Sequence, residues 1–433
     1  MYFLYNVLLM LAAVFAGPYY GFKMLFAGKY RKSLGPKLGM IPEETYAAMR
    51  GSPRIWIHAV SVGEVTAAAP ILSSIREQLP EACLVLSTST ETGQDMARRL
   101  VKGATAVIYY PLDIPWTVRK VLDHIKPDLF VPVETEIWPN FMRACREMGV
   151  RIILVNGRLS PRSFHRYAAT RFFWKQIIRW FDAICVISEV DAQRARKLGM
   201  PQDRIHVFGN AKYDGLASQA RPALQDEMAS RLPIRPGEPV LVAGSTHEGE
   251  EKLVLHVYRK LLKREPLFKL ILVPRHIERS QSVLRIVREE GFEDCVTLSE
   301  INGGRGYNDE RIILVDVIGE LFKLYSLATV VFCGGSLVPK GGQNILEPAA
   351  WGKVVFYGPS MEDFSQERAI LEGVGAGIMI QNEQGLYEGI MSLIRNPGEM
   401  RDRGQKGREA VAANMGASVR YAEMVRLLIS RPV

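Results

Sequence analysis

Glu64 is the first residue of the sequence whose position suits acid–base chemistry. It ends the stretch His58-Ala-Val-Ser-Val-Gly-Glu64, which joins the apolar run 54–60 to a helical pattern over about 64–77. Since ligands of open α/β sheets bind beyond the carboxyl ends of the strands, a carboxylate here could act as a general base in a cleft. The alternative is a structural carboxylate stabilised by the dipole of the helix that it begins.

A second pair of carboxylates, Glu134 and Glu136, follows the apolar run 128–134 in the sequence ETEIWPN (134–140). On an extended chain, side chains two residues apart share a face, so the pair could bind a metal ion. The alternative is one buried carboxylate held by backbone amides and one solvated carboxylate. The spacing alone favours this alternative over the metal pair.

Three segments in the second half of the chain are candidates for nucleotide binding, because each follows an apolar run. They are VPRH (273–276), VIGE (317–320) and GGSLVPKGGQNILEP (334–348). Arg275 could contact a phosphate, glycines before a helix could cradle it with backbone N–H groups, and Glu347 could accept ribose hydroxyls. Each segment alone could be an ordinary strand-to-helix turn, but together they indicate a nucleotide site.

Several well-known catalytic motifs are missing from the sequence. The segment 244–249 has the glycine spacing of a P-loop, but Glu250 stands where a lysine is required. No GxGxxG follows the first predicted strand, and His247-Glu248 lacks the second histidine of a zinc protease. These absences argue against an NTPase, a dehydrogenase and a zinc protease.

Short apolar runs that alternate with helical patterns would position the candidate residues. Such runs are typical of strands buried on both faces of a parallel sheet, and the alternation predicts doubly wound α/β domains. The predicted strands lie at 54–60, 84–90, 106–112, 128–134, 151–157, 183–188, 205–210, 239–245, 269–275, 311–317, 328–335, 353–359 and 376–380. A proline-rich break at 216–239 separates two domains, with a cleft expected between them, and a helical pattern over about 398–429 closes the chain.

The N-terminal residues 2–22 carry no charge, and the following residues 23–54 contain seven basic and two acidic side chains. An apolar run of about 20 residues is long enough to span a bilayer, and basic charge after the run places the rest of the chain in the cytoplasm. Gly17-Pro18 could instead kink the segment into a helix that lies in the membrane interface.

The composition of the 433 residues is globular, with 48% hydrophobic and 23% charged residues, which excludes a disordered chain and a polytopic membrane protein. The net charge of +9 favours anionic partners. Five scattered cysteines without CxxC spacing exclude a zinc ribbon and a disulfide scaffold. Basic and aromatic residues interleave over 156–180 without any acidic residue, which fits either a solvated helix face or an anionic lipid surface.

Six motifs together make the chain resemble the 3-deoxy-D-manno-octulosonic acid (Kdo) transferase family. They are SVGE (61–64), ETEIWPN (134–140), GNAKYD (209–214), AGSTHEGEE (243–251), VPRH (273–276) and GGQNILEP (341–348). That family transfers Kdo from CMP-Kdo to the lipid A precursor (lipid IVA) in lipopolysaccharide biosynthesis. The resemblance covers almost the whole chain, and it implies an inverting glycosyltransferase of GT-B fold, with two Rossmann-like domains, a cleft and an N-terminal membrane anchor. It also implies no cofactor and no metal at the catalytic centre.

The resemblance assigns roles to residues of this chain. Glu64 matches the general base, and Glu134 and Lys212 match residues that stabilise the transition state. The carboxylate of Kdo is a plausible partner for Lys212. The matching CMP-binding residues are Pro274, Arg275, Ile318, Gly319, Glu320, Asn344, Ile345, Leu346 and Glu347. Many relatives have histidine at the position of Gln343, which puts a role for a histidine there in doubt.

The expected organisation follows from these assignments. The domains are an anchor (1–28), an acceptor-binding domain (29–215), a linker (216–238), a CMP-sugar-binding domain (239–410) and a C-terminal helix (411–433). The expected location is the inner membrane with the catalytic domains on its cytoplasmic face, and the expected partners are the lipid A precursor, CMP-Kdo and the membrane surface, without nucleic acid. The alternatives are another GT-B enzyme of envelope lipids and a tethered solute-binding protein, but the latter requires an export signal that the sequence lacks.

Overall fold

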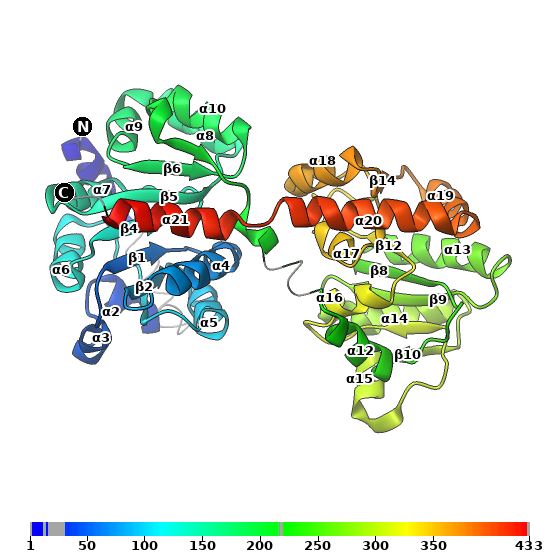
Figure 1. The fold of residues 1–433 in the computed structure, drawn as a ribbon. Coiled ribbons are helices and arrows are strands. Elements are labelled where there is room, and N and C mark those ends of the chain that lie inside the picture. The colour runs from blue at the N-terminus through cyan, green and yellow to red at the C-terminus, as the bar shows by residue number, and fades with distance from the viewer. Residues whose placement is uncertain (1, 12–13, 16–30, 215, 217–219, 431–433) are drawn as a thin grey trace. The chain divides into compact units, whose positions relative to one another are not determined.

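The computed structural model describes residues 2–11, 14–15, 31–214, 216 and 220–430 of the chain. The chain divides into two compact units. The first unit contains Met1–Asp214 and Met415–Val433, and the second contains Gly215–Asn414. Each unit is built around its own parallel sheet, as the alternation of apolar runs and helical patterns predicts (Figure 1).

The sheet of the first unit has seven parallel strands in the order β3-β2-β1-β4-β5-β6-β7. Their bounds are β1 Arg54–His58, β2 Cys83–Thr88, β3 Ala106–Tyr109, β4 Leu129–Pro132, β5 Arg151–Gly157, β6 Ala183–Val186 and β7 Ile205–Val207. The order places β1 between β2 and β4, so the segments that follow β1 and β4 emerge side by side at the carboxyl edge of the sheet.

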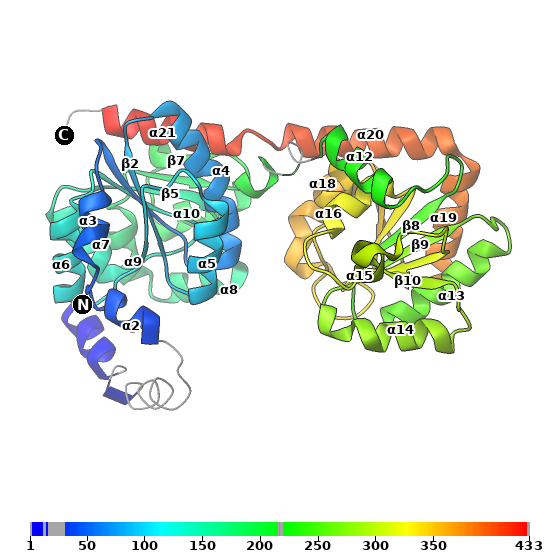
Figure 2. The ribbon, with the colours of Figure 1, turned by 90° about the horizontal axis from the view of Figure 1, so that it is seen from below.

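Helices cover both faces of this sheet (Figure 2). The alternation of side chains in β1 illustrates the two layers: Trp56 packs into the core with helices α6 and α7, whereas Ile55 and Ile57 pack with α4 and α21. The helices of the unit are α2 Arg31–Lys37, α3 Glu43–Ala48, α4 Val62–Gln78, α5 Glu91–Leu100, α6 Pro115–Ile125, α7 Pro139–Glu147, α8 Pro161–Ala169, α9 Arg171–Ile178, α10 Glu189–Leu198 and α21 Ala417–Ser430, with short 3₁₀ turns at Gln202–Arg204 and Ala211–Tyr213.

The sheet of the second unit also has seven parallel strands, in the order β10-β11-β9-β8-β12-β13-β14. Their bounds are β8 Val240–Thr246, β9 Lys269–Pro274, β10 Cys295–Thr297, β11 Ile312–Leu314, β12 Val330–Cys333, β13 Val354–Tyr357 and β14 Gly377–Met379. The helices are α12 Pro222–Arg231, α13 Glu250–Leu262, α14 Ser280–Glu289, α15 Leu298–Glu300, α16 Leu321–Leu324, α17 Leu346–Ala350, α18 Ser365–Gly373, α19 Glu383–Arg395 and α20 Pro397–Ala413.

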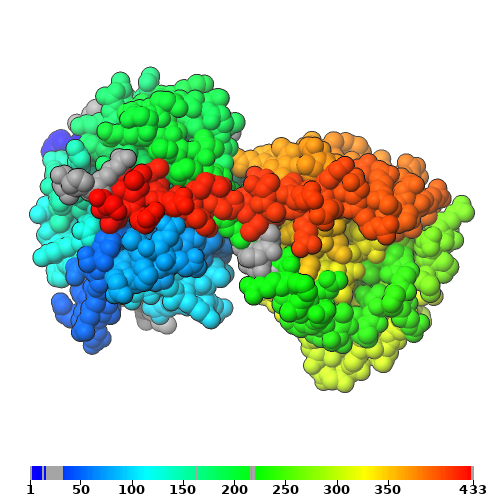
Figure 3. Space-filling view, in the orientation of Figure 1, coloured from blue at the N-terminus to red at the C-terminus, as the bar shows by residue number. Residues whose placement is uncertain are grey.

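The helical pattern over 398–429 forms two helices, because the chain turns at Gly416 with φ +81° between α20 and α21. Helix α20 packs on α17 in the second unit, and α21 packs on α4 in the first. In Figure 3 the red atoms of α21 cover the surface of the first unit beside the blue atoms of α4. The expected linker 216–238 contains α12, which packs on α16 of the second unit.

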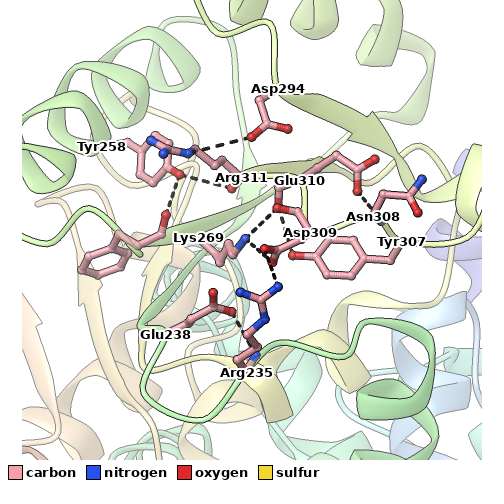
Figure 4. Close-up of polar contacts among 11 residues, drawn as sticks. Arg235, Glu238, Tyr258, Lys269, Asp294, Tyr307, Asn308, Asp309, Glu310 and Arg311 are labelled. Carbon is pink, nitrogen blue, oxygen red and sulfur yellow. Dashed lines mark hydrogen bonds and ion pairs between the residues drawn. The ribbon is translucent and has the colours of Figure 1, made fainter.

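A polar network closes the amino-terminal end of the second sheet (Figure 4). Lys269, the first residue of β9, is buried, and its Nζ donates to Asp309 Oδ1 at 2.7 Å and to the backbone oxygen of Asp309 at 2.8 Å. Arg235 Nη2 lies 3.1 Å from Asp309 Oδ2, and the Tyr258 hydroxyl donates to Phe268 O at 2.7 Å. This network lies at the opposite end of the strands from the predicted nucleotide segments.

The predicted membrane anchor, residues 1–28, lies mostly outside the described residues. Residues 2–11 and 14–15 are helical. Among the helices in the described ranges, none combines the length and the apolar character needed to cross a bilayer. The anchor therefore stays a prediction.

Candidate active site

Glu64 lies in the first turn of α4, directly after β1. The turn between strand and helix is closed by its side chain, since Oε2 accepts a hydrogen bond from the backbone N–H of Val60 at 2.6 Å. The hydroxyl of Ser61 donates to Oε1 at 3.4 Å. The carboxylate is thus fixed at the carboxyl edge of the sheet, where the sequence places it.

Burial raises the pKa of Glu64 to about 7. The negative charges of Glu136 and Glu134 contribute to this increase, while the hydrogen bond from Val60 acts in the opposite direction. A carboxyl group with this pKa can accept a proton near neutral pH, as general base catalysis requires. The influence of Glu134 and Glu136 also indicates that the three carboxylates share one region of the first unit.

Glu134 follows β4 and forms an ion pair with Lys212. Its Oε1 lies 2.7 Å from Lys212 Nζ, and both side chains are partly exposed. The backbone of Glu134 has φ +62°, and its N–H donates to Val155 O at 3.0 Å. A left-handed conformation is unusual for a residue other than glycine, and strained residues of this kind cluster at functional sites.

The sequence argument that placed Glu134 and Glu136 on one face, where they could bind a metal ion, fails in the structure. The premise of an extended chain is wrong, because Glu134 is in the left-handed region, and Glu136 accepts a hydrogen bond from Trp138 Nε1 at 2.9 Å. Burial raises the pKa of Glu136 as well. In the part of the chain that the structure describes, no group of three or more histidine, cysteine or acidic residues could hold a metal ion.

The loop that carries Lys212 is held by two asparagines. Asn156, at the carboxyl end of β5, is buried with φ +51°, and its Oδ1 accepts from Ala211 N at 2.9 Å. Asn210 Oδ1 accepts from Lys212 N at 3.1 Å. These side chains fix the backbone next to the lysine, and neither was identified from the sequence.

Helix α21 holds the same loop from the outside. Tyr421, which is buried, donates from its hydroxyl to Gly209 O at 2.7 Å, and Arg420 Nη2 donates to Phe208 O at 2.6 Å. Asp214 Oδ2 accepts from Ser418 N at 2.5 Å, at the start of the helix. The end of the chain thus positions the segment that carries Lys212. A separation of over 200 residues hides this relationship from sequence patterns.

In the second unit, four of the predicted CMP-binding residues line one cavity of 270 Å³: Pro274, Arg275, Ile318 and Gly319. Pro274 ends β9, and Arg275 follows it with an exposed side chain. Gly319 lines this cavity with φ +92°, a left-handed backbone conformation that favours glycine. The structure therefore brings the VPRH and VIGE segments together.

Glu347 and Asn344 are not among the residues that line this cavity, but the charge of Arg275, which does line it, lowers the pKa of Glu347. Burial is the larger effect and raises that pKa to about 7. Asn344 Nδ2 donates to Glu347 Oε1 at 3.1 Å, and Asn344 Oδ1 accepts from Leu346 N at 3.1 Å. A partly exposed carboxylate oriented by an amide is suited to accept ribose hydroxyls.

The remaining predicted CMP-binding residues, Ile345, Leu346 and Glu320, do not line this cavity. Ile345 and Leu346 are buried in the core of the unit, so only their backbone can face a ligand. Glu320 Oε2 accepts from Arg231 Nη1 of α12 at 3.0 Å. Glu320 therefore ties the VIGE turn to the segment that was expected to be a linker.

The glycine-rich loop after β12 is not a free phosphate cradle. Buried Glu250, at the start of α13, accepts from the backbone N–H groups of Gly335 at 2.7 Å, Ser336 at 3.1 Å and Leu337 at 3.0 Å. It also accepts from His247 N at 2.9 Å. These N–H groups cannot bind phosphate as the sequence suggested, because a carboxylate of the protein already occupies them.

Comparison with known proteins places the chain among Kdo transferases. A family model described as "3-Deoxy-D-manno-octulosonic-acid transferase (kdotransferase)" matches residues 32–215. A 3-deoxy-D-manno-octulosonic acid transferase of Chlamydophila psittaci is 31% identical, over 94% of this chain and 91% of the relative. One of Haemophilus influenzae is 29% identical, over 100% of this chain and 99% of the relative.

The fold is shared with solved structures of more distant sequence. A glycosyltransferase from Rickettsia africae superposes with a TM-score of 0.59 over 88% of this chain and 100% of that chain, at 13% identity. At this level of identity the likeness concerns the fold alone. It agrees with two units that each contain a parallel sheet flanked by helices.

Proposed function

Since this chain belongs to the 3-deoxy-D-manno-octulosonic acid transferase family and is a Kdo-transferring glycosyltransferase of lipopolysaccharide biosynthesis, we propose that it uses CMP-Kdo as donor and the lipid A precursor as acceptor. We propose further that it has a GT-B fold and inverts the anomeric configuration. In this reaction an acceptor hydroxyl attacks the anomeric carbon and loses its proton, while CMP departs with the bonding electrons.

The position and pKa of Glu64 are the observation that carries this proposal. A carboxylate with a pKa of about 7, fixed at the carboxyl edge of the first sheet, can take the proton of the acceptor hydroxyl. The ion pair of Glu134 with Lys212 in the same region supports their role in stabilising the transition state.

The second unit provides the donor site in this proposal. Arg275 would contact the phosphate of CMP and stabilise the charge that develops on it as the bond to Kdo breaks. Glu347 would accept ribose hydroxyls, and the cavity at Pro274 and Gly319 would take the rest of the nucleotide. The charge on the leaving phosphate is then met by a guanidinium, so we propose that no metal ion is required.

We also propose that the first unit binds the cytoplasmic face of the inner membrane. The described part of the N-terminal helix is held on the unit, since the Tyr2 ring lies 5.7 Å from that of Phe173 and the Tyr5 hydroxyl donates to Asp113 at 2.8 Å. Seven of its apolar side chains are exposed, namely Phe3, Leu4, Leu8, Met10, Leu11, Val14 and Phe15. Exposed Phe172 on the basic helix α9 adds to this surface.

One assay tests the reaction. The protein is incubated with CMP-Kdo generated in place and with a lipid A precursor in vesicles, and the lipid is analysed by mass spectrometry. We expect the lipid to gain the mass of one or more Kdo residues, and the number of additions counts the transfers. Parallel reactions with UDP- and ADP-sugars test the alternative of another envelope glycosyltransferase. Transfer of a sugar from either of these donors would support that alternative.

A further inference from the structure

A buried nitrogen of His247, in the second unit, has no hydrogen-bond partner among the residues that the structure describes. His247 follows β8, and its backbone N–H donates to Glu250 at 2.9 Å, which fixes the residue. Its Nε2 is buried and has no hydrogen-bond partner among the described residues. Leaving a buried polar group without a hydrogen bond is unfavourable, so such an atom in a native protein calls for an explanation.

A second hydrogen-bond donor borders the same place. A side chain at Gly335 would come within 3.3 Å of His247 Nε2 and within 3.5 Å of Gln343 Nε2. The edge of the imidazole and the amide of Gln343 therefore both lie beside the space that Gly335 leaves. The Gln343 side chain makes no hydrogen bond to another described residue and is partly exposed, so its amide is available to a ligand that enters beside His247.

Charged groups of both signs surround this place. The ring of His276 lies 5.8 Å from that of His247. Burial lowers the pKa of His247, and the charges of His276, Lys340 and Arg275 lower it further, whereas Glu250 acts in the opposite direction. His247 is thus neutral at pH 7 and can donate from Nε2, with Arg275 and Lys340 nearby, while the Glu250 carboxylate is already held by backbone N–H groups.

The donor substrate has an anion that the site described so far does not hold. CMP-Kdo carries a phosphate, which is assigned to Arg275, and a sugar carboxylate next to the anomeric carbon. Lys212 is the partner that the sequence suggests for this carboxylate, but its Nζ already lies 2.7 Å from Glu134. The carboxylate needs hydrogen-bond donors close to the phosphate. His247 is close enough to Arg275 for the charge of Arg275 to lower the pKa of His247.

We propose that His247 Nε2 and the Gln343 amide bind the carboxylate of the donor sugar, and that this contact orients the anomeric carbon. The inference rests on the proposed donor. Two neutral donors hold the carboxylate while the charge of Arg275 stays available for the leaving phosphate. The two residues are binding residues for Kdo and not for the nucleotide.

The variants His247→Phe and Gln343→Leu test this assignment, with His256→Phe on α13 as a matched control away from the site. KM for CMP-Kdo is measured by the transfer assay, and Kd for CMP by calorimetry. We expect each variant to raise KM for CMP-Kdo about tenfold, the loss expected for one hydrogen bond to a carboxylate, while Kd for CMP stays within about twofold. His247→Asn, which keeps an N–H donor, should recover part of the loss.

Other outcomes overturn the assignment. If affinity for CMP falls as much as that for CMP-Kdo, the residues hold the phosphate or the structure of the loop, and if neither value changes, they contact no donor group. Should His247→Phe fail to fold, the partly exposed Gln343→Leu decides alone. If the wild-type enzyme is active and the variants have its KM for CMP-Kdo, only this inference is refuted. If the wild-type protein cannot use CMP-Kdo, the proposed function is refuted and the inference with it.

Discussion

Lys212 Nζ lies 2.7 Å from Glu134 Oε1, although the two residues are 78 positions apart. Glu134 follows β4, in the middle of the first sheet, and Lys212 follows β7, at its edge. The left-handed backbone of Glu134 and the loop contacts of Asn156 and Asn210 bring the two together. Several features of the backbone thus serve a single ion pair, which argues that the pair is functional.

Removing either partner of this pair should affect turnover more than stability. Since both side chains are partly exposed, the ion pair itself should contribute no more than about 1 kcal/mol to folding. We expect Lys212→Met and Glu134→Gln each to lower kcat by about 100-fold or more, if the pair stabilises developing charge. Steady-state kinetics and thermal unfolding of the same samples check this. A large fall in Tm with near-normal kcat would assign a purely structural role.

Glu64→Gln should remove the base and also the pH dependence of the reaction. The general base must be ionised, so kcat/KM of the wild-type enzyme should rise with pH through about 7 and then level off. The variant should lose about 10²–10⁴-fold in turnover and lack this rise. CMP affinity, measured by calorimetry, should stay near wild type. A variant that keeps most of the turnover would refute the role of Glu64.

The same substitution has an expected effect on stability, because the pKa of Glu64 in the folded protein lies above its ordinary value of 4.5. The folded protein holds a proton that the unfolded chain releases, so the contribution of Glu64 is fully present below pH 4.5 and is lost as the pH rises through about 7. Compared with Glu64→Gln, the wild-type protein should therefore lose stability between about pH 4.5 and 7. Thermal unfolding across that range, in matched buffers, measures the difference.

The strands were predictable from the sequence because most are short apolar runs, and those in the middle of each sheet are buried on both faces. Thirteen expected runs correspond to strands, and β5 has the predicted bounds 151–157. The strand β10, Cys295–Thr297, was missed because three residues between polar segments give no periodic signal. The position of Glu64 after β1 was also predictable, since it depends only on where a strand ends.

The residues that hold the site together were not predictable, because they act across long separations in sequence. Tyr421 donates a hydrogen bond to Gly209 O in the loop before Lys212. The backbone N–H groups that begin at Gly335 donate to the Glu250 carboxylate. A sequence pattern indicates a glycine-rich loop but not which acceptor satisfies it. The unsatisfied Nε2 of His247 likewise becomes visible only when all its neighbours are in place.

Glu347 should make nucleoside binding depend on pH. An ionised carboxylate is the better acceptor for ribose hydroxyls, so affinity for cytidine should rise as the pH passes about 7. Cytidine is the better probe, because the phosphate of CMP itself titrates near pH 6. Calorimetry at pH 6, 7 and 8 should show this rise in the wild-type protein and not in Glu347→Gln. Arg275→Ala removes a charge that lowers the pKa of Glu347, so it should move the rise to higher pH.

Arg275→Ala is expected, in addition, to weaken CMP binding about tenfold or more at constant pH, through the loss of a charge-assisted contact. Cytidine, which lacks the phosphate, should be affected much less. Equal losses for both ligands would place Arg275 at the nucleoside instead of the phosphate.

Tyr421→Phe should loosen the loop that carries Lys212. The substitution removes the hydrogen bond to Gly209 O and leaves that carbonyl without its donor, at a cost of about 1–3 kcal/mol. Because displacement of a catalytic group by small distances slows reactions strongly, we expect kcat to fall about tenfold with little change in Kd for CMP. Tyr387→Phe on α19 is the matched control. A normal kcat in Tyr421→Phe would mean that α21 does not position Lys212.

Glu250→Gln should destabilise the second unit, because the carboxylate serves four backbone N–H groups with two oxygens. Glutamine offers only one oxygen and presents an NH₂ group to donors, so at least one N–H among Gly335, Ser336 and Leu337 is left unpaired. We expect a loss of about 3 kcal/mol in the free energy of unfolding, measured by urea denaturation. The control is Glu248→Gln, two residues earlier on an exposed position, which should change it by less than about 0.5 kcal/mol. Equal stability of the two variants would mean that the loop after β12 does not depend on the Glu250 carboxylate, and the N–H groups of that loop would again be candidates for binding phosphate.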